Sequence, residues 1–221
     1  MDRLFSLFSL YDFVTYIFTG AALLAGVVWA VSGVPSEPGA TAALGLVVAS
    51  YIAGHLVQAL AVLWEREWWG RIRGGWPSAL RMMPDARQAY QPEFRELVLR
   101  GLSANRGNDI VKLTPARQFA LARADLRARG EDVRAETMNA LYAFSRGLAT
   151  AGIVLGVTFV VDWRVSGSGA AGVAAIVAAV AGLLFLYRFD RFGFFFADQV
   201  WQDYAATIGR SAAPVPSSTE G

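Results

Sequence analysis

Long stretches without charged residues alternate with polar stretches along this chain. Phe13–Ser32 and Ala42–Trp64 contain no Asp, Glu, Lys or Arg, and two further uncharged stretches, Gly147–Val161 and Ala170–Tyr187, follow a central polar segment. About 20 apolar residues in a helix cross the hydrocarbon core of a bilayer. The pattern therefore predicts four transmembrane helices. A cleavable signal peptide at Phe13–Ser32 is the disfavoured alternative, because the run is too long and follows acidic residues.

The connecting segments carry turn and helix signals. Gly33–Ala40 and Asp162–Gly169 are rich in Gly, Pro and Ser and predict two short turns between spans. The central segment, residues 65–142, predicts three helices. The first covers Pro92–Asn105, the second has Thr114 as N-cap and Pro115 at its first position and ends at Gly130, and the third begins at Asp132 and runs into the third span.

The two ends of the chain differ from the spans. Residues 1–12 have apolar side chains at helical spacing with polar side chains between them, which predicts an amphipathic helix at the membrane interface. Residues 188–209 extend the last span as a helix with an aromatic face, formed by Phe189, Phe192, Phe196, Val200 and Tyr204. Residues 210–221 predict a disordered tail.

Together these elements predict an all-α integral membrane protein. Two transmembrane hairpins, residues 13–64 and 143–187, form a bundle of four helices. The 65–142 insertion and the extension of the last helix form a small helical cytoplasmic domain. The chain thus divides into an interfacial helix, two membrane hairpins, one insertion, one extension and a tail.

The placement of basic residues predicts the orientation. Most of the 20 Lys and Arg residues lie between the second and third spans, whereas the two short turns contain only Arg164. Because basic segments stay on the cytoplasmic side, both termini and the insertion are expected in the cytoplasm, with the protein in the inner or plasma membrane. Six arginines are predicted at the cytoplasmic membrane surface, where anionic lipid attracts them: Arg66, Arg71, Arg73, Arg146, Arg188 and Arg191.

Composition narrows the possible chemistry. The chain is 55% hydrophobic and 17% charged, has no cysteine and has a single histidine, His55. Disulfides, thiol nucleophiles and Cys-ligated metals are therefore excluded, and no phosphate-loop, HExxH or GxSxG motif occurs. Asp190, Asp198 and Asp203 suggest a metal or phosphate site beside Arg188 and Arg191, but a solvated helix face explains them better. We expect no enzyme activity, no cofactor and no metal.

Polar side chains on the first two spans form a predicted intramembrane seam. Tyr51, His55 and Gln58 are spaced i, i+4 and i+7 and share one helix face, while Tyr16 and Thr19 lie on the first span. Polar groups in hydrocarbon need partners, so the seam is expected to face inward. Structural hydrogen bonding and a water-filled path or ligand site are both open, and His55 is either a structural residue or a proton-sensitive gate.

Small residues recur at intervals of four on the spans. Gly152 and Gly156 form a GxxxG motif on the third span, and Gly45, Ala49 and Ala53 follow the same spacing on the second. Such residues let helix backbones approach closely. They predict packing either within one bundle or between subunits of a homo-oligomer, which we expect this protein to form.

The leading functional hypothesis is a non-enzymatic, oligomeric membrane protein, either a channel-like pore or a membrane-effector module. Its cytoplasmic helices would bind a protein or an anionic small molecule, with the lipid bilayer as the other partner. Nucleic acid is not expected, since acidic residues are interspersed among the arginines and no stacking aromatics accompany them. The alternatives are a membrane-embedded enzyme acting on lipid, using His55 or the Asp190 region, and a structural membrane scaffold.

Overall fold

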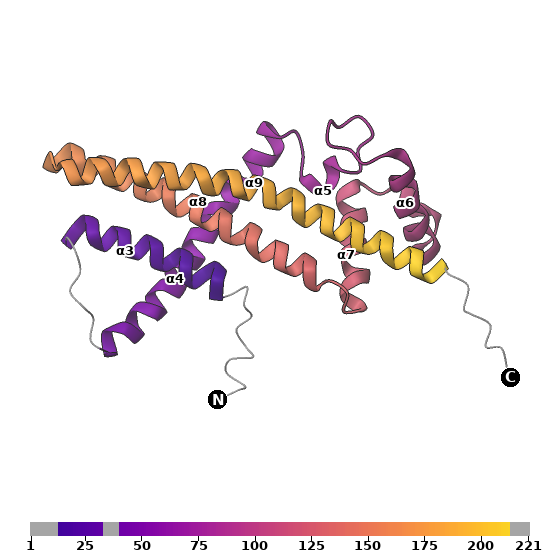
Figure 1. The fold of residues 1–221 in the computed structure, drawn as a ribbon, viewed down its shortest axis with the longest axis horizontal. Coiled ribbons are helices and arrows are strands. Elements are labelled where there is room, and N and C mark those ends of the chain that lie inside the picture. Colours follow the sequence, from indigo (N-terminus) through magenta and orange to yellow (C-terminus); the bar gives the residue numbers. More distant parts are fainter. Residues whose placement is uncertain (1–12, 33–39, 213–221) are drawn as a thin grey trace. The chain divides into compact units, whose positions relative to one another are not determined.

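The structure is a computed structural model that describes residues 13–32 and 40–212 of the 221-residue chain. These residues form helices and loops, and no strand occurs among them. The helices are η1 (Phe13–Phe18), α3 (Thr19–Ser32), α4 (Ala40–Glu67), η2 (Trp68–Ile72), α5 (Pro77–Leu80), α6 (Pro92–Arg106), η3 (Asn108–Lys112), α7 (Pro115–Ala128), α8 (Val133–Ser166) and α9 (Gly169–Ala212) (Figure 1). The predicted all-α class is confirmed. The predicted interfacial helix at 1–12, most of the first turn and most of the tail lie outside the described residues.

Among the residues that the structure describes, three helical stretches are long and apolar enough to cross a membrane: Ala43–Leu80, Val133–Ser166 and Gly169–Arg210. The first predicted span coincides with η1 and α3, whose apolar part, Thr15–Val31, is shorter than these three. The length and composition of the helices are thus those of a membrane-associated protein.

The predicted turn at Asp162–Gly169 is mostly helix. α8 continues to Ser166, and only two residues separate it from α9. No Gly or Pro interrupts the chain after Gly156 until Gly167, whose φ of +69° is left-handed and ends the helix. The polar composition of the segment did not stop the helix, because charged and hydroxyl side chains at a helix end can all point to solvent.

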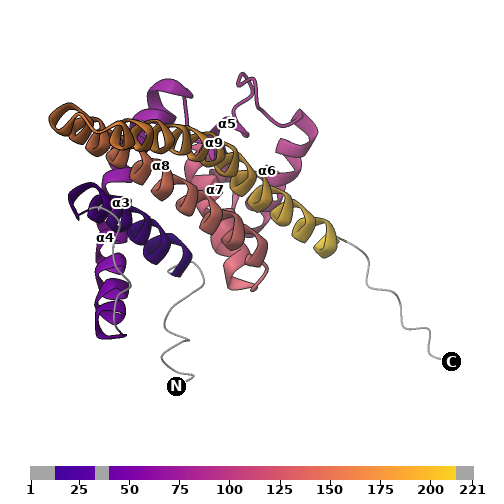
Figure 2. The same cartoon turned by 60° about the vertical axis from the view of Figure 1, so that its left-hand side comes forward.

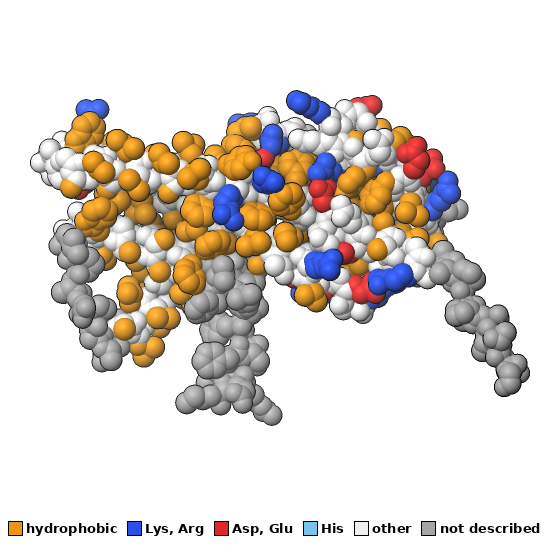
Figure 3. Space-filling model, viewed as in Figure 1, with side chains coloured by type: hydrophobic (Ala, Val, Ile, Leu, Met, Phe, Trp, Pro, Cys, Tyr) orange, Lys and Arg blue, Asp and Glu red, His pale blue; other side chains and the backbone are white. Residues whose placement is uncertain are grey.

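The chain divides into two compact units. One contains the described residues up to Trp68 together with Thr137–Gly193, and the other contains Trp69–Glu136 together with the described residues from Phe194. On the face drawn in Figure 3, hydrophobic side chains predominate on the first unit, and most of the visible Asp and Glu side chains lie on the second. α8 and α9 each contribute residues to both units.

In the first unit, α3 lies against α4 because two glycines remove the side chains between them (Figures 1 and 2). A Cβ added to Gly20 would overlap the carbonyl oxygen of Ser50, and one added to Gly54 would overlap that of Tyr16. Both glycines therefore allow backbone contact between the helices, as small residues do in membrane bundles.

The stripe predicted on α4, Gly45, Ala49 and Ala53, does not make the contact with α3. Ala53 is buried, but Gly45 and Ala49 are exposed, and no heavy atom outside its own helix lies within 4 Å of a Cβ placed on Gly45. The neighbouring pair Ser50 and Gly54 has the same four-residue spacing and makes the contact with α3 instead. Composition cannot separate two such adjacent rows, because both contain only small residues.

The GxxxG motif of α8 packs against α9 within the same chain. A Cβ on Gly152 would lie 2.7 Å from the Cα of Gly182, whereas one on Gly156 would be in ordinary contact, 3.8 Å from the backbone nitrogen of Ala179. Of the two predicted uses of this motif, the contact that Gly152 makes is packing within one chain. A Leu at Gly152 is accordingly expected to disrupt the fold.

The second unit has a compact core of its own. Val98 and Leu102 from α6, Leu126 from α7, and Val200 and Trp201 from α9 are fully buried together. The aromatic extension of the last span therefore supplies part of this core, as its spacing predicted.

The predicted helix starts in this unit are confirmed, with one difference. Pro92 and Pro115 begin α6 and α7, and Gly130, with φ +68°, follows the end of α7. Thr114 occupies the N-cap position of α7 but makes no side-chain capping bond. The short α5 and η3 were not predicted.

Replacing Gly54 with Ala tests the contact between α3 and α4. Even one methyl group at this position overlaps the backbone of Tyr16, so Gly54→Ala should lower the free energy of unfolding by about 1–3 kcal/mol. Gly45→Ala, on the same helix in open space, is the matched control and should not lower it. Thermal unfolding of both variants in detergent, followed by circular dichroism, measures the difference. Equal melting of the two variants would contradict the packing described.

Candidate functional site

Two charged residues that border the uncharged runs of α4 and α8 lie opposite each other on these two helices. Glu65 is the first acidic residue after the uncharged run of α4, and Arg146 is the last basic residue before the uncharged run of α8. Gln58 precedes Glu65 by seven positions and Tyr142 precedes Arg146 by four, so each pair shares one helix face. These spacings place four polar side chains where α4 meets α8.

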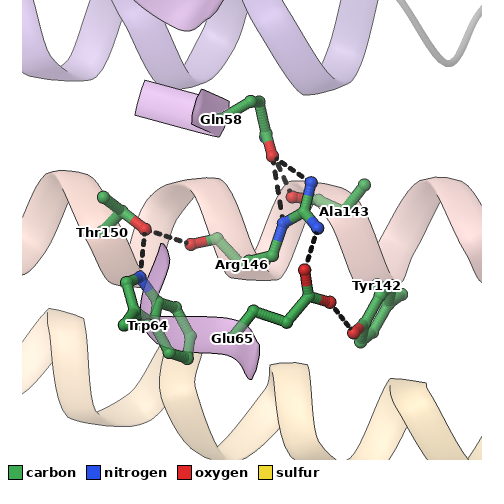
Figure 4. Close-up of polar contacts among 7 residues, drawn as sticks. All are labelled: Gln58, Trp64, Glu65, Tyr142, Ala143, Arg146 and Thr150. Carbon is green, nitrogen blue, oxygen red and sulfur yellow. Dashed lines mark hydrogen bonds and ion pairs between the residues drawn. The ribbon is translucent and has the colours of Figure 1, made fainter. Parts of the chain in front are cut away.

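Arg146 is the centre of the resulting network (Figure 4). Its Nη1 donates to a carboxylate oxygen of Glu65, and its Nη2 and Nε donate to Oε1 of Gln58 at 2.7 and 3.2 Å. Nε2 of Gln58 donates to the carbonyl oxygen of Ala143 at 3.1 Å. The Tyr142 hydroxyl donates to the other oxygen of Glu65. Every member of the network is thus bonded to another part of the same unit.

A second polar link joins the same two helices one turn away. Nε1 of Trp64 donates to the hydroxyl of Thr150 at 2.9 Å, and this hydroxyl donates to the carbonyl oxygen of Arg146 at 2.9 Å (Figure 4). The ring of Trp64 also meets Phe189 of α9 edge-on, with 5.0 Å between centroids, and Tyr142 stacks on Phe189 at 4.9 Å. Aromatic contacts therefore extend the network to α9.

The ion pair is buried. Only 14% of the Arg146 side chain and 6% of the Glu65 side chain are exposed. Removing two charges from water costs several kcal/mol for each ion, and their attraction offsets this cost only where additional hydrogen bonds satisfy the remaining donors and acceptors. Gln58 and Tyr142 supply those bonds. The pair consequently favours an arrangement of α4 and α8 that keeps these side chains together, because separating them would leave a buried charge unpaired.

Arg146, which was predicted at the cytoplasmic membrane surface, is largely buried and bonded to Glu65 and Gln58. The other five arginines of that set are exposed: Arg66, Arg71, Arg73, Arg188 and Arg191. Arg146 differs because its helix face also carries Tyr142 and Thr150 and meets α4, which offers both a carboxylate and an amide. A count of arginines near span ends does not distinguish these two environments.

The predicted intramembrane seam divides into two parts. Gln58 and Thr19 are buried, and a Cβ added to Gly147 of α8 would lie 2.5 Å from Nε2 of Gln58 and 2.7 Å from Cγ2 of Thr19. The hydroxyl of Thr19 donates to the carbonyl oxygen of Thr15 at 2.5 Å. These two predicted residues therefore line the junction of three helices.

The other three residues of the seam form a group of rings. Tyr16 stacks on His55 with 4.0 Å between centroids, and Tyr51 meets His55 edge-on at 4.6 Å. His55 is exposed, so it does not face inward as predicted. Tyr51, His55 and Gln58 share one broad face of α4 by their spacing. Only part of that face is buried: Gln58 is buried, whereas His55 is exposed.

The second unit contains a separate polar cluster that the sequence analysis missed. Asp198, predicted on a solvated face, accepts from Nη2 of Arg81 at 2.6 Å and from the hydroxyl of Tyr90 at 2.5 Å, and is only 19% exposed. Burial raises the pKa of Tyr90, and the hydrogen bond to Asp198 and its negative charge raise it further, against a smaller lowering by Arg81. The Tyr90 phenol therefore stays protonated and donates to Asp198 well into the alkaline range.

The described residues contain no group of three or more His, Asp and Glu side chains that could hold a metal ion. Asp190 accepts a hydrogen bond from Nε1 of Trp68 at 3.1 Å. The carboxylates that the sequence analysis grouped thus have different structural partners in the two units.

These observations define an all-helical chain with membrane-length apolar helices and a buried ion-pair network between two of them. No family model, curated protein or solved structure matches the chain.

The ion pair makes a specific prediction for single and paired substitutions. Arg146→Met or Glu65→Leu alone leaves an uncompensated buried charge and should cost about 3–5 kcal/mol of unfolding free energy. The double variant Glu65→Leu/Arg146→Met removes both charges and should recover most of that loss. Chemical unfolding in detergent measures all three. Additive losses in the double variant would contradict the coupling, and a harmless single substitution would contradict the burial.

Proposed function

We propose that this chain is a non-enzymatic, multi-pass membrane protein that anchors a small helical domain to the cytoplasmic face of the inner or plasma membrane, where the domain binds a protein partner. The observation that carries the proposal is the continuity of α8 and α9. Each is a single helix with an apolar, membrane-length part in the first unit and a polar or aromatic part in the second. A domain built on such helices is tethered to the membrane through them.

Four spans are the arrangement that best accounts for the first unit. η1 and α3 contain 6 and 14 residues in succession, which at 1.5 Å per residue is about 30 Å, the thickness of the hydrocarbon core. With α4, α8 and α9 they make two hairpins. The concentration of arginines between the second and third spans supports a cytoplasmic location for the second unit and both termini.

The distribution of polar groups in the first unit supports an anchor more than a pore. Gln58, Glu65 and Arg146 bond to one another in the interior. The exposed side chains of the same helices are largely aliphatic, such as Leu56, which is 63% exposed, and Val157, which is 61% exposed. An apolar exterior suits contact with lipid, and the charges that a water-filled path would need are engaged in helix packing.

An oligomeric pore is the second candidate, and one observation favours it. Residues 43–49 of α4 are exposed on every side and include Gly45 and Ala49. This short segment, with two small residues on one face, is available to a second chain, and a path between chains could include the exposed His55. A homo-oligomer thus stays part of both proposals.

Topology and ion flux together test the first candidate against the second. Reporters fused at residue 110 and at the C-terminus should report the cytoplasm, and fusions at residues 36 and 166 should report the outside, because of the arginine asymmetry. Purified protein in liposomes should pass no more ions than protein-free vesicles do.

Two results would change the proposal. An external signal from residue 110 would overturn the topology. Ion flux whose pH dependence between 5 and 8 disappears in His55→Gln would select the pore instead, since histidine is the side chain that ordinarily titrates in that interval.

A further inference from the structure

A groove between α8 and α9 lies within the first unit, where the two helices run side by side (Figures 1 and 2). Its volume is about 460 Å³, within the range of sites that hold one small ligand. Only Gly, Ala, Val, Ile and Leu side chains line it. Small residues create the hollow, since Gly156 and Ala179 face each other where longer side chains would fill the space.

The dimensions of the groove fit one leaflet of a bilayer. On α9 its lining runs from Ala175 to Leu186, which corresponds to about 16 Å at 1.5 Å per residue. Half of the roughly 30 Å hydrocarbon core is about 15 Å. Val157 and Leu183, on opposite walls, are more than 60% exposed, so the groove opens to the lipid-facing side of the helices.

Polar groups follow the groove at both ends: Asp162 and Arg164 come after Val161 on α8, and a phenol and a guanidinium come after Leu186 on α9. The α9 end is the one that lies on the proposed cytoplasmic side, and it carries no carboxylate in the row that leaves the groove. Leu183 in its wall begins a row at four-residue spacing that continues with Tyr187 and Arg191. Arg191 is exposed, and its Nη1 lies 3.4 Å from the Tyr187 hydroxyl. The nearby Asp190 accepts a hydrogen bond from Trp68. A guanidinium and a phenol thus stand beyond the apolar groove, where a lipid headgroup would lie.

We propose that this groove binds one acyl chain of an anionic glycerophospholipid, whose phosphate is held by Arg191 with Tyr187 beside it. The proposal rests on the membrane location proposed above and is independent of any protein partner. Guanidinium groups bind phosphate oxygens through charge-assisted hydrogen bonds, and anionic headgroups lack the choline cation that would oppose Arg191.

A helix of a second copy is the other possible occupant, and the structure favours lipid over it. The close-approach surface of the GxxxG motif is already used, because Gly152 packs on Gly182 of the same chain. An acyl chain needs no free glycine surface.

Native mass spectrometry of the full chain in detergent, with equal amounts of phosphatidylglycerol and phosphatidylcholine, tests the site. The wild-type protein should retain one phosphatidylglycerol. Ala179→Leu fills the groove and should lower this adduct about tenfold, as expected for the loss of about 1.4 kcal/mol of binding free energy. Ala59→Leu, the same change on the exposed face of α4, is the control and should retain the adduct.

A second pair of variants tests the headgroup. Arg191→Gln should lower the preference for phosphatidylglycerol over phosphatidylcholine about fivefold, the effect of one basic residue near a membrane surface. Arg188→Gln is the matched control, because Arg188 is exposed five positions from Leu183, on another side of α9, and lies over the ring of Phe192. The Arg188→Gln variant should prefer phosphatidylglycerol over phosphatidylcholine as strongly as the wild type does.

Several outcomes would overturn the proposal: no lipid on the wild type, equal retention by Ala179→Leu, or unchanged headgroup preference in Arg191→Gln. Loss of a protein dimer in Ala179→Leu would assign the groove to a second copy. Thermal unfolding unchanged from the wild type shows that Ala179→Leu is folded. If Ala179→Leu unfolds, Gly156→Val takes its place, because it fills the groove from α8 without a close contact. Failure here would leave the reporter topology intact, so the two proposals fail separately.

Discussion

A charge inside an apolar helix bundle must have a partner, and this requirement determines how the first unit is assembled. Glu65 and Arg146 lie at the ends of uncharged stretches, and helices α4 and α8 bury both of them. Because Gln58 also bonds the guanidinium and Tyr142 also bonds the carboxylate, a placement of these two helices that separated the four side chains would leave a buried charge without its partner. The small residues that bring helices into contact act within the placement that keeps these side chains together.

The same constraint bears on function. Internal pairing leaves the exterior of the first unit aliphatic, which suits lipid and supports an anchor more than a conducting path. The polar chemistry that does reach the exterior is limited to particular places, such as the rings around His55 and the arginines near the end of the apolar part of α9. The proposed lipid site uses one of those arginines together with an apolar groove.

Hydrophobic patterning was sufficient to predict the all-helical class, and proline signals were sufficient to predict the starts of α6 and α7, because both kinds of signal are local. They were insufficient wherever the outcome depended on a neighbouring helix. Arg146 looked like a membrane-surface residue, and only the face that α4 presents to it explains its burial. Likewise, Gly45 and Gly54 are equivalent in sequence, yet only Gly54 meets α3. Which residue packs against a given helix face depends on the tertiary structure and cannot be predicted from sequence spacing alone.

The most direct test of the account is the protection of the α4–α8 junction. Since the chain has no cysteine, Ala143→Cys introduces a unique thiol at a residue of α8 that is 3% exposed in the wild type and whose carbonyl oxygen accepts a hydrogen bond from Gln58. Ala104→Cys provides an exposed reference. A charged maleimide should label the thiol at position 143 far more slowly than that at position 104. Adding Glu65→Leu should accelerate labelling at 143 toward the reference rate, because Arg146 is then left unpaired. Equal labelling at the two positions with the ion pair intact would contradict the claim that this pair closes the junction.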